Sequence, residues 1–168
     1  MATFIKIASS TVGSGGVASV TFSGIPQTGY TDLVVKYSGR ANDNGISDGF
    51  AIRFNGTTTG YSGRNIGGDG TSVTSAGGTG DRFLGINGTA STANTFTNGE
   101  VYIPNYTSSN FKSYSVDYSI ENNGTANFMS LGAPIWSNTA AITSITLIDD
   151  GKDLLQHSTF YLYGIKKN

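Results

Sequence analysis

Residues 140–168 read AAITSITLIDDGKDLLQHSTFYLYGIKKN and contain two runs of alternating side chains. In the first run, Ile145 and Leu147 alternate with small polar residues. In the second run, Phe160 and Leu162 share one face of an extended chain, and tyrosines occupy the opposite face. Because side chains on a β-strand point alternately to its two faces, each run predicts a strand with one buried face.

The length and composition indicate one domain that covers residues 1–168. The chain has no Cys, but nine Tyr and nine Phe in 168 residues are enough to form a core without disulfides. The chain has ten Lys and Arg residues and eleven Asp and Glu residues, and it contains no basic run. No nucleic-acid partner is therefore expected. No apolar run approaches the ~20 residues of a membrane span, so no membrane partner is expected. The start MATFIKIASS lacks the features of a signal peptide, which predicts synthesis in the cytoplasm.

The rest of the chain repeats the pattern of alternating strand, polar loop and alternating strand. The clearest alternation lies in residues 112–120, where four residues are expected to face inward: Tyr114, Val116, Tyr118 and Ile120. Other expected inward faces are Ile5 with Ile7, Leu33 with Val35 and Tyr37, and Phe50 with Ile52 and Phe54. Connections rich in Gly, Asn and Ser separate these runs, which is typical of an all-β domain.

We therefore predict an all-β fold, a two-sheet antiparallel β-sandwich of about ten strands with jelly-roll-like connections. Several connections are long enough to cross between sheets. Residues 61–66 are expected to form a short edge strand and residues 67–80 a long exposed loop. Residues 149–156 are expected to form one helical turn, and no longer helix is predicted, because no segment shows apolar residues at helical spacing over three turns.

Two groups of acidic residues are candidates for a calcium site. Residues 42–48, NDNGISD, resemble an oxygen-rich calcium loop, with Asp43 and Asp48 as carboxylates. The acidic ligand at the twelfth position is absent, so an ordinary Asx-rich turn is the favoured alternative. The second group consists of Asp149, Asp150 and Asp153. We expect no bound metal and no cofactor.

The remaining polar residues form no catalytic constellation. His157 is the only histidine, so it supports neither a catalytic triad nor a histidine-rich metal site, and it is expected at the entry to the last strand. The two glutamates, Glu100 and Glu121, are not paired in a way that indicates glycoside hydrolysis. Glycine-rich residues 67–70 and 77–80 lack the Lys-Ser/Thr of a phosphate loop and predict flexible loops. We expect that the protein is not an enzyme.

Four Asn-x-Thr patterns match a glycosylation signal but are expected to be turns, because no signal peptide accompanies them. They begin at Asn55, Asn87, Asn105 and Asn123.

Trp136 is the single tryptophan and the one candidate contact residue. It precedes a polar loop. An exposed Trp on a β-sandwich can stack on a sugar ring, whereas a buried one belongs to the core or to a subunit interface. Both interpretations follow from the sequence.

Three segments carry a family resemblance: residues 22–33, FSGIPQTGYTDL; residues 52–56, IRFNG; and the closing pair AITSI and FYLYGI. They resemble a family of small virion proteins of tailed phages, especially cyanophages and other aquatic phages. The resemblance spans about residues 3–166. Its motifs are structural, so it assigns no catalytic residue. It implies a jelly-roll-like β domain displayed on the particle, as a capsid cement (decoration) protein or as a fibre or tail module.

The expected role is that of a capsid cement protein that stabilises the phage head from outside. Its partners would be the major capsid protein and further copies of itself, as a trimer or, as the nearest competitor, a dimer. The alternative is a receptor- or carbohydrate-binding module of a tail fibre or head fibre. The first predicted strand begins by about Thr3, which leaves no room for a fibre anchor and favours the cement role. The expected location is the capsid surface of the virion, after synthesis in the host cytoplasm.

Overall fold

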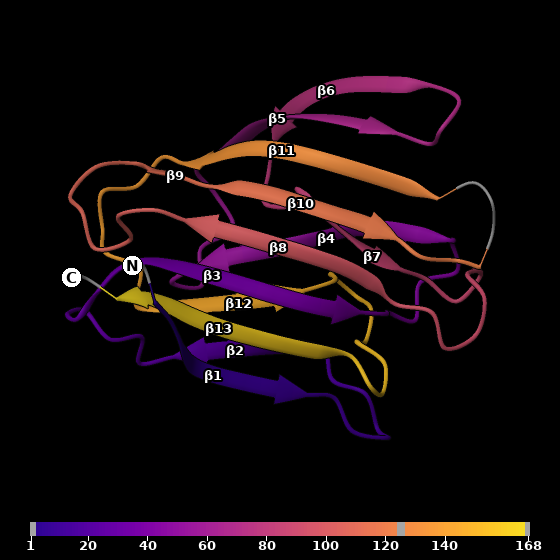
Figure 1. The fold of residues 1–168 in the computed structure, drawn as a ribbon, viewed down its shortest axis with the longest axis horizontal. Helices are drawn as coiled ribbons and strands as arrows, with labels where there is room; N and C mark the ends of the chain where they lie inside the picture. Colours follow the sequence, from indigo (N-terminus) through magenta and orange to yellow (C-terminus); the bar gives the residue numbers. More distant parts are fainter. Residues whose placement is uncertain (1–2, 124–126, 167–168) are drawn as a thin grey trace.

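The computed structural model describes residues 3–123 and 127–166, which form thirteen β-strands and no helix (Figure 1). These ranges accordingly hold no helix that could span a membrane. The strands are β1 (Phe4–Thr11), β2 (Ser19–Ser23), β3 (Tyr30–Gly39), β4 (Ser47–Phe54), β5 (Tyr61–Gly68), β6 (Val73–Thr79), β7 (Leu84–Asn87), β8 (Thr97–Ile103), β9 (Lys112–Ser113), β10 (Ser115–Ile120), β11 (Phe128–Trp136), β12 (Ser144–Ile148) and β13 (Thr159–Lys166).

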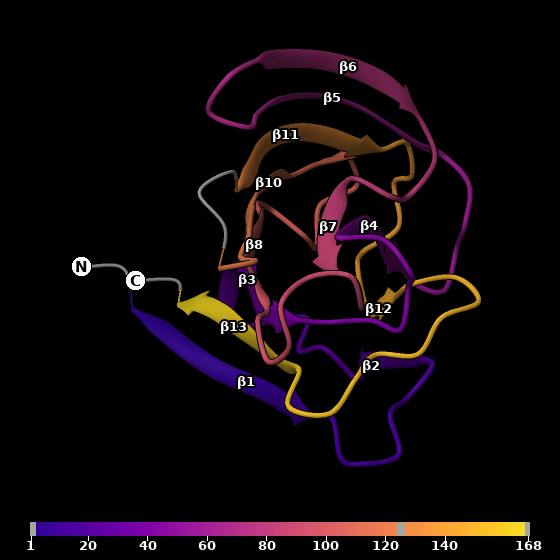
Figure 2. The same ribbon diagram turned by 90° about the vertical axis from the view of Figure 1, so that its right-hand side faces the viewer.

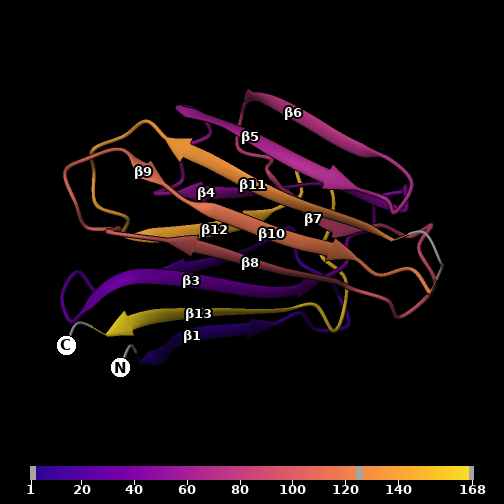
Figure 3. The same cartoon turned by 45° about the horizontal axis from the view of Figure 1, so that its top comes forward.

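The strands form two antiparallel sheets. The large sheet has the order β1-β13-β3-β8-β10-β11-β5-β6, with β9 paired to β11, and the small sheet has the order β2-β12-β4-β7. Figure 2 shows the large sheet curving from β1 to the β5–β6 hairpin around the small sheet. Figure 3 shows the strands of the large sheet running side by side. The predicted all-β, two-sheet antiparallel sandwich is confirmed, with thirteen strands instead of about ten.

The chain crosses repeatedly between the sheets. It changes sheet at every step from β1 to β5, at both steps from β6 through β7 to β8, and at both steps from β11 through β12 to β13. A jelly roll consists of eight strands in two sheets, and the order of β1–β4, β7, β8, β12 and β13 is compatible with it. The remaining strands, β5, β6 and β9–β11, widen the large sheet beyond β8. The jelly-roll connectivity stays a prediction, because only the strand order bears on it.

The core lies between the sheets and contains most residues that the alternation predicts to face inward. Phe50, Ile52 and Phe54 on β4 are fully buried, as predicted. In residues 112–120, the buried members of the predicted set are Tyr114, Val116 and Ile120. Tyr118 is only partly buried, and its ring lies 6.2 Å from the ring of Phe128.

Two glycines make room for aromatic rings between the sheets. Gly99 on β8 is opposite Tyr37 on β3, and a Cβ atom at Gly99 would lie 2.3 Å from the Tyr37 ring. Gly85 on β7 is covered by Tyr118 in the same way, also at 2.3 Å. The Gly85 carbonyl in turn accepts a hydrogen bond of 2.9 Å from the Tyr37 hydroxyl. A side chain at either glycine would displace a ring from the core.

The segment predicted as an edge strand and a long loop is instead a hairpin. β5 is an interior strand between β11 and β6, and β6 is the edge of the large sheet. A tight turn joins the two strands: Gly70 has a φ of 84°, and the Asp69 carboxylate accepts hydrogen bonds from the backbone N–H groups of Thr71 and Ser72 at 2.8 and 2.6 Å. Every residue of β6 is exposed, so this strand has no apolar alternation that sequence analysis could detect.

Two other segments differ from prediction. Residues 149–156 form no helical turn. Lys152 N donates to Asp149 O at 2.9 Å across a turn in which Gly151 has a φ of 77°, and the fully buried Leu154 then bridges through its backbone to Val17 and Ala41. Ile5 is 37% exposed, although it is opposite the buried Gly164, because β1 is the edge strand of the large sheet.

Candidate functional site

Trp136 lies in the core at the end of β11. Its residue is 1% exposed, and its ring contacts those of Phe54 and Tyr61 at centroid distances of 5.5 and 6.2 Å. The core interpretation of Trp136 therefore agrees with the structure. The ring presents no exposed face, so the stacking interpretation and the subunit-interface interpretation are corrected.

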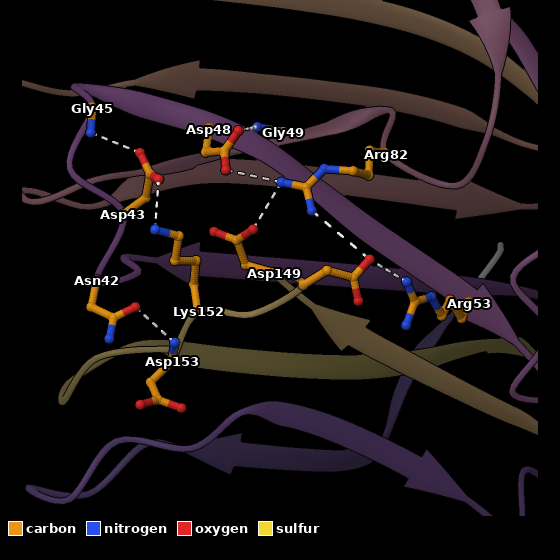
Figure 4. A network of polar contacts seen from close by, with 11 residues as sticks. Asn42, Asp43, Gly45, Asp48, Gly49, Arg53, Arg82, Asp149, Lys152 and Asp153 are labelled. Atoms are coloured by element: carbon orange, nitrogen blue, oxygen red, sulfur yellow. Dashed lines mark hydrogen bonds and ion pairs between the residues drawn. The ribbon is translucent and has the colours of Figure 1, made fainter.

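A network of ion pairs lies where the chain leaves β12 (Figure 4). The buried Asp149 carboxylate accepts a hydrogen bond of 2.8 Å from Arg82, which also donates to Asp48 at 3.0 Å. The second Asp149 oxygen, Oδ2, has no hydrogen-bond partner among the described residues. Burial raises the pKa of the Asp149 carboxyl, and the Arg82 guanidinium acts in the opposite direction.

The network extends to both sides of Asp149. Arg53 donates to Asp81 at 2.5 Å and also to Asp150, and Lys152 pairs with Asp43 at 3.4 Å. The two acidic groups that the sequence suggested separately thus lie in one network, with three cations interleaved (Figure 4). These cations at positions 53, 82 and 152 follow no motif spacing, so no sequence signal could have linked them to the acids.

The network joins residues of β4 to the β6–β7 and β12–β13 loops and is not arranged as a metal site. In residues 3–123 and 127–166, no three His, Cys, Asp or Glu side chains are placed to hold a metal ion. Asp43 instead accepts a hydrogen bond of 2.7 Å from the Gly45 N–H, as expected for an Asx turn. In the described structure Asp153 takes part through its backbone alone: its N–H donates to the Asn42 side chain at 2.8 Å, and its carbonyl accepts from Asn42 N at 2.9 Å.

The two glutamates have separate structural contacts. Glu100 lies on β8 and pairs with Lys36 of β3 at 2.6 Å, and both side chains are exposed. Glu121 follows β10 and accepts a hydrogen bond of 2.5 Å from the backbone N–H of Asn123. Nothing in these contacts resembles a pair of catalytic carboxylates.

Two of the four Asn-x-Thr patterns begin at residues in turns, as predicted. Asn55 and Asn105 have positive φ angles of 52° and 49°, as turn residues do. Asn87 corrects the prediction: it is the buried end of β7, and its amide donates to Thr95 Oγ1 at 3.1 Å. The pattern that begins at Asn123 runs into residues outside the described ranges.

A cleft of about 550 Å³ lies at the end of the sandwich where four loops converge. These loops join β1 to β2, β3 to β4, β7 to β8 and β12 to β13, on the right-hand side in Figure 1. The cleft is lined mainly by polar residues, together with two glycines and the apolar side chains of Ala93, Phe96 and Leu155. His157 lies on its wall, two residues before β13, close to the predicted strand entry and with a φ of 73°. No sequence pattern linked these four loops.

An exposed apolar surface covers the outer face of β11, β5 and β6. Its members are Ile66, Val73, Met129 and Leu131, of which Val73 is 85% exposed. The register places Leu131 opposite Ile66, and Met129 opposite Gly68, which is itself opposite Val73. Single exposed apolar residues are ordinary, but a contiguous group is typical of a contact surface. We call this group the β5–β6 surface.

Comparison of the chain with protein-family models, curated proteins and solved structures gave no match. The resemblance to phage virion proteins stays a prediction, and the function is argued from the surfaces described above.

Proposed function

We propose that the protein is a non-enzymatic phage virion structural protein that cements the capsid from outside, with the major capsid protein and further copies of itself as partners. The observation that supports a protein-binding role is the β5–β6 surface, which includes the edge strand β6, unpaired on its outer side by any described residue. The family resemblance supports the location on the capsid. The alternative role, a receptor- or carbohydrate-binding module of a tail or head fibre, is an outcome of the experiment below.

The free edge of β6 is suited to pairing with another strand. Two hydrogen bonds at the ends of the hairpin, from Asp69 N to Ser72 O and from Gly80 N to Tyr61 O, show which opposite residues of β5 and β6 form hydrogen-bonded pairs. In this arrangement the backbone N–H and C=O groups of four β6 residues point away from β5: Val73, Ser75, Gly77 and Thr79. Charged residues, Pro and β-bulges usually protect a sheet edge from association. β6 contains none of these.

Two modes of self-association use this edge. Pairing of β6 with β6 of a second copy creates a two-fold dimer. Pairing of β6 with β1, the opposite edge of the large sheet, creates a head-to-tail contact that can close into a ring such as a trimer. Phe4 and Ile5 on β1 are also exposed, which supports the second mode. We retain the trimer as the proposed state, because icosahedral shells offer three-fold sites, with the dimer as its competitor.

Cementing acts through mass action. A ligand that binds only the assembled shell stabilises the shell by RT ln(1 + [L]/Kd), about 2.7 kcal/mol per site at a hundredfold excess over Kd. Particles stripped of this protein should therefore release DNA at lower temperature or after osmotic shock, and adding the protein back should restore resistance. If stripped particles keep full resistance and lose adsorption to host cells, the receptor-binding alternative replaces the cement role.

The contribution of the edge can be tested separately. Ser75→Lys places a charge on the free edge of β6, whereas the matched control Thr71→Lys places the same charge at the exposed turn. We expect Ser75→Lys to reduce the oligomer mass in analytical ultracentrifugation and to weaken binding to stripped capsids. Thr71→Lys should do neither. Equal behaviour of the two variants would remove β6 from the proposed contact.

A further inference from the structure

Arg40, which lines the cleft at the loop end of the sandwich, fixes one wall of the cleft through buried contacts. Arg40 is 8% exposed, and its guanidinium donates to four backbone carbonyls of the β7–β8 loop. The acceptors and distances are Thr92 at 2.8 Å, Ser91 at 2.9 Å, Thr95 at 3.0 Å and Thr89 at 3.3 Å. Since these contacts engage both terminal nitrogens, Arg40 shapes one wall of the cleft and is not free to pair with a charged ligand.

The β3–β4 and β12–β13 loops, which also line the cleft, are tied to their neighbours in the same manner. Asn42 N donates to Asp153 O at 2.9 Å, and Asp153 N donates to the Asn42 side chain at 2.8 Å. His157 N donates to Val12 O at 3.0 Å, which links the β12–β13 loop to the end of β1. Loops that are tied before binding lose little conformational entropy when a ligand arrives.

Four polar side chains in the cleft are available to a ligand. The Asp153 carboxylate, the Gln156 and Asn94 amides and the His157 imidazole line the cleft and belong to exposed residues. Within the described part of the chain, none of these side chains makes a hydrogen bond or an ion pair. Together they offer both donors and acceptors around one space, with the half-buried ring of Phe96 beside them.

We propose that this cleft binds a neutral saccharide. Adjacent hydroxyl groups of a sugar both donate and accept, so they match a carboxylate beside primary amides, and the C–H face of the ring matches an aromatic side chain. The volume falls in the range of small-molecule sites. An anionic ligand is disfavoured, because the Arg40 guanidinium is engaged by carbonyls and Asp153 carries a negative charge. The inference does not depend on the cement role, since the cleft and the β5–β6 surface involve different strands and loops.

Nuclear magnetic resonance titration of the ¹⁵N-labelled protein tests the proposal directly. The probes are the methyl glycosides of glucose, galactose, mannose and N-acetylglucosamine, with inorganic phosphate as the anionic comparison. We expect saturable shifts of backbone amides in residues 14–16, 89–96 and 153–157 with at least one glycoside, and none with phosphate. Failure of every glycoside, or saturable shifts confined to another region, would reject the proposal. Binding of phosphate alone in the cleft would also reject it.

Variants assign the contacts. Asp153→Ala and Gln156→Ala remove exposed side chains without touching the backbone ties, so both variants should fold, as their spectra will show. Each should weaken glycoside binding about tenfold, the effect of one lost hydrogen bond of ~1.4 kcal/mol. Asn110→Ala, on an exposed residue of the β8–β9 loop at the opposite end of the sandwich, is the control and should bind as the unmodified protein does. Unchanged affinity in both cleft variants would overturn the assignment.

Discussion

Replacing Arg82 by Met should destabilise the protein strongly at neutral pH. The change keeps an apolar stem and removes the only hydrogen-bond partner of the buried Asp149 side chain in the described structure. Two unit charges about 4 Å apart interact by ~4 kcal/mol at an effective dielectric constant of 20. Removing one partner of a buried ion pair costs about 3–5 kcal/mol, because the other charge stays buried. Arg82 is itself partly exposed, so we expect the lower end, about 3 kcal/mol, or a fall in Tm of about 6–12 °C.

Urea unfolding followed by the fluorescence of Trp136 measures this effect, because Trp136 is the single tryptophan and is buried. Lys36→Met is a matched control. It removes a cation from the exposed pair with Glu100, and exposed pairs contribute at most about 1 kcal/mol. The double variant Arg82→Met with Asp149→Asn should recover part of the loss, since the unpaired charge is gone.

The pH dependence of the Arg82→Met variant has a defined sign. The folded-state pKa of Asp149 is raised by burial, so the folded protein holds the proton over a pH range in which the unfolded chain has lost it. Stability from this group is complete below the unfolded pKa of about 3.9 and is lost as pH rises through the folded pKa. Loss of Arg82 raises that pKa further, so the deficit should shrink toward pH ~4. A deficit no larger than that of Lys36→Met, or one independent of pH, would refute the reasoning.

Three further predictions concern the core and the acidic residues. Val116→Asp should cost several kcal/mol, because it places an unpaired charge at a position that is 2% exposed; an unchanged Tm would show that the side chain can reach water. Gly85→Ala should cost about 1–3 kcal/mol by displacing the ring of Tyr118, whereas Gly78→Ala, with nothing within 4 Å of the added Cβ, should be nearly neutral in the same urea assay. Addition of EDTA should leave the Tm unchanged, and a large drop would revive a calcium site in the acidic network.

The parts of the fold that the sequence predicts are those in which burial differs between the two faces of a strand. The alternation at residues 50–54 and 114–120 reports directly on such a difference, and these strands lie where expected. β6 gives no such signal, because both of its faces are exposed and its conformation comes from pairing with β5 across the Gly70-Thr71 turn. Local sequence suggested a helical turn at 149–156, but the buried Leu154 outweighs it.

The candidate sites were harder to predict, because their members come from distant parts of the chain. The acids at Asp43 and Asp149 were visible as two groups, yet only folding places Arg82 between Asp48 and Asp149. The cleft likewise needs four separate loops. Trp136 illustrates a different difficulty, because its residue type is compatible both with a core position and with a ligand contact. Only the packing of β11 on β4 shows that it lies in the core.

The pairing of the first strand with the last determines how the domain responds to mechanical force. Phe4 lies opposite Ile165, and Thr11 lies opposite Thr159. The start of β1 and the end of β13 therefore lie at the same end of one hydrogen-bonded ladder. A load applied between Phe4 and Ile165 would open this ladder one hydrogen-bonded pair at a time, whereas a load along the strands would strain many pairs together. Under a load between Phe4 and Ile165, strand β1 would therefore separate from β13 at low force, while the other strands of both sheets stayed paired.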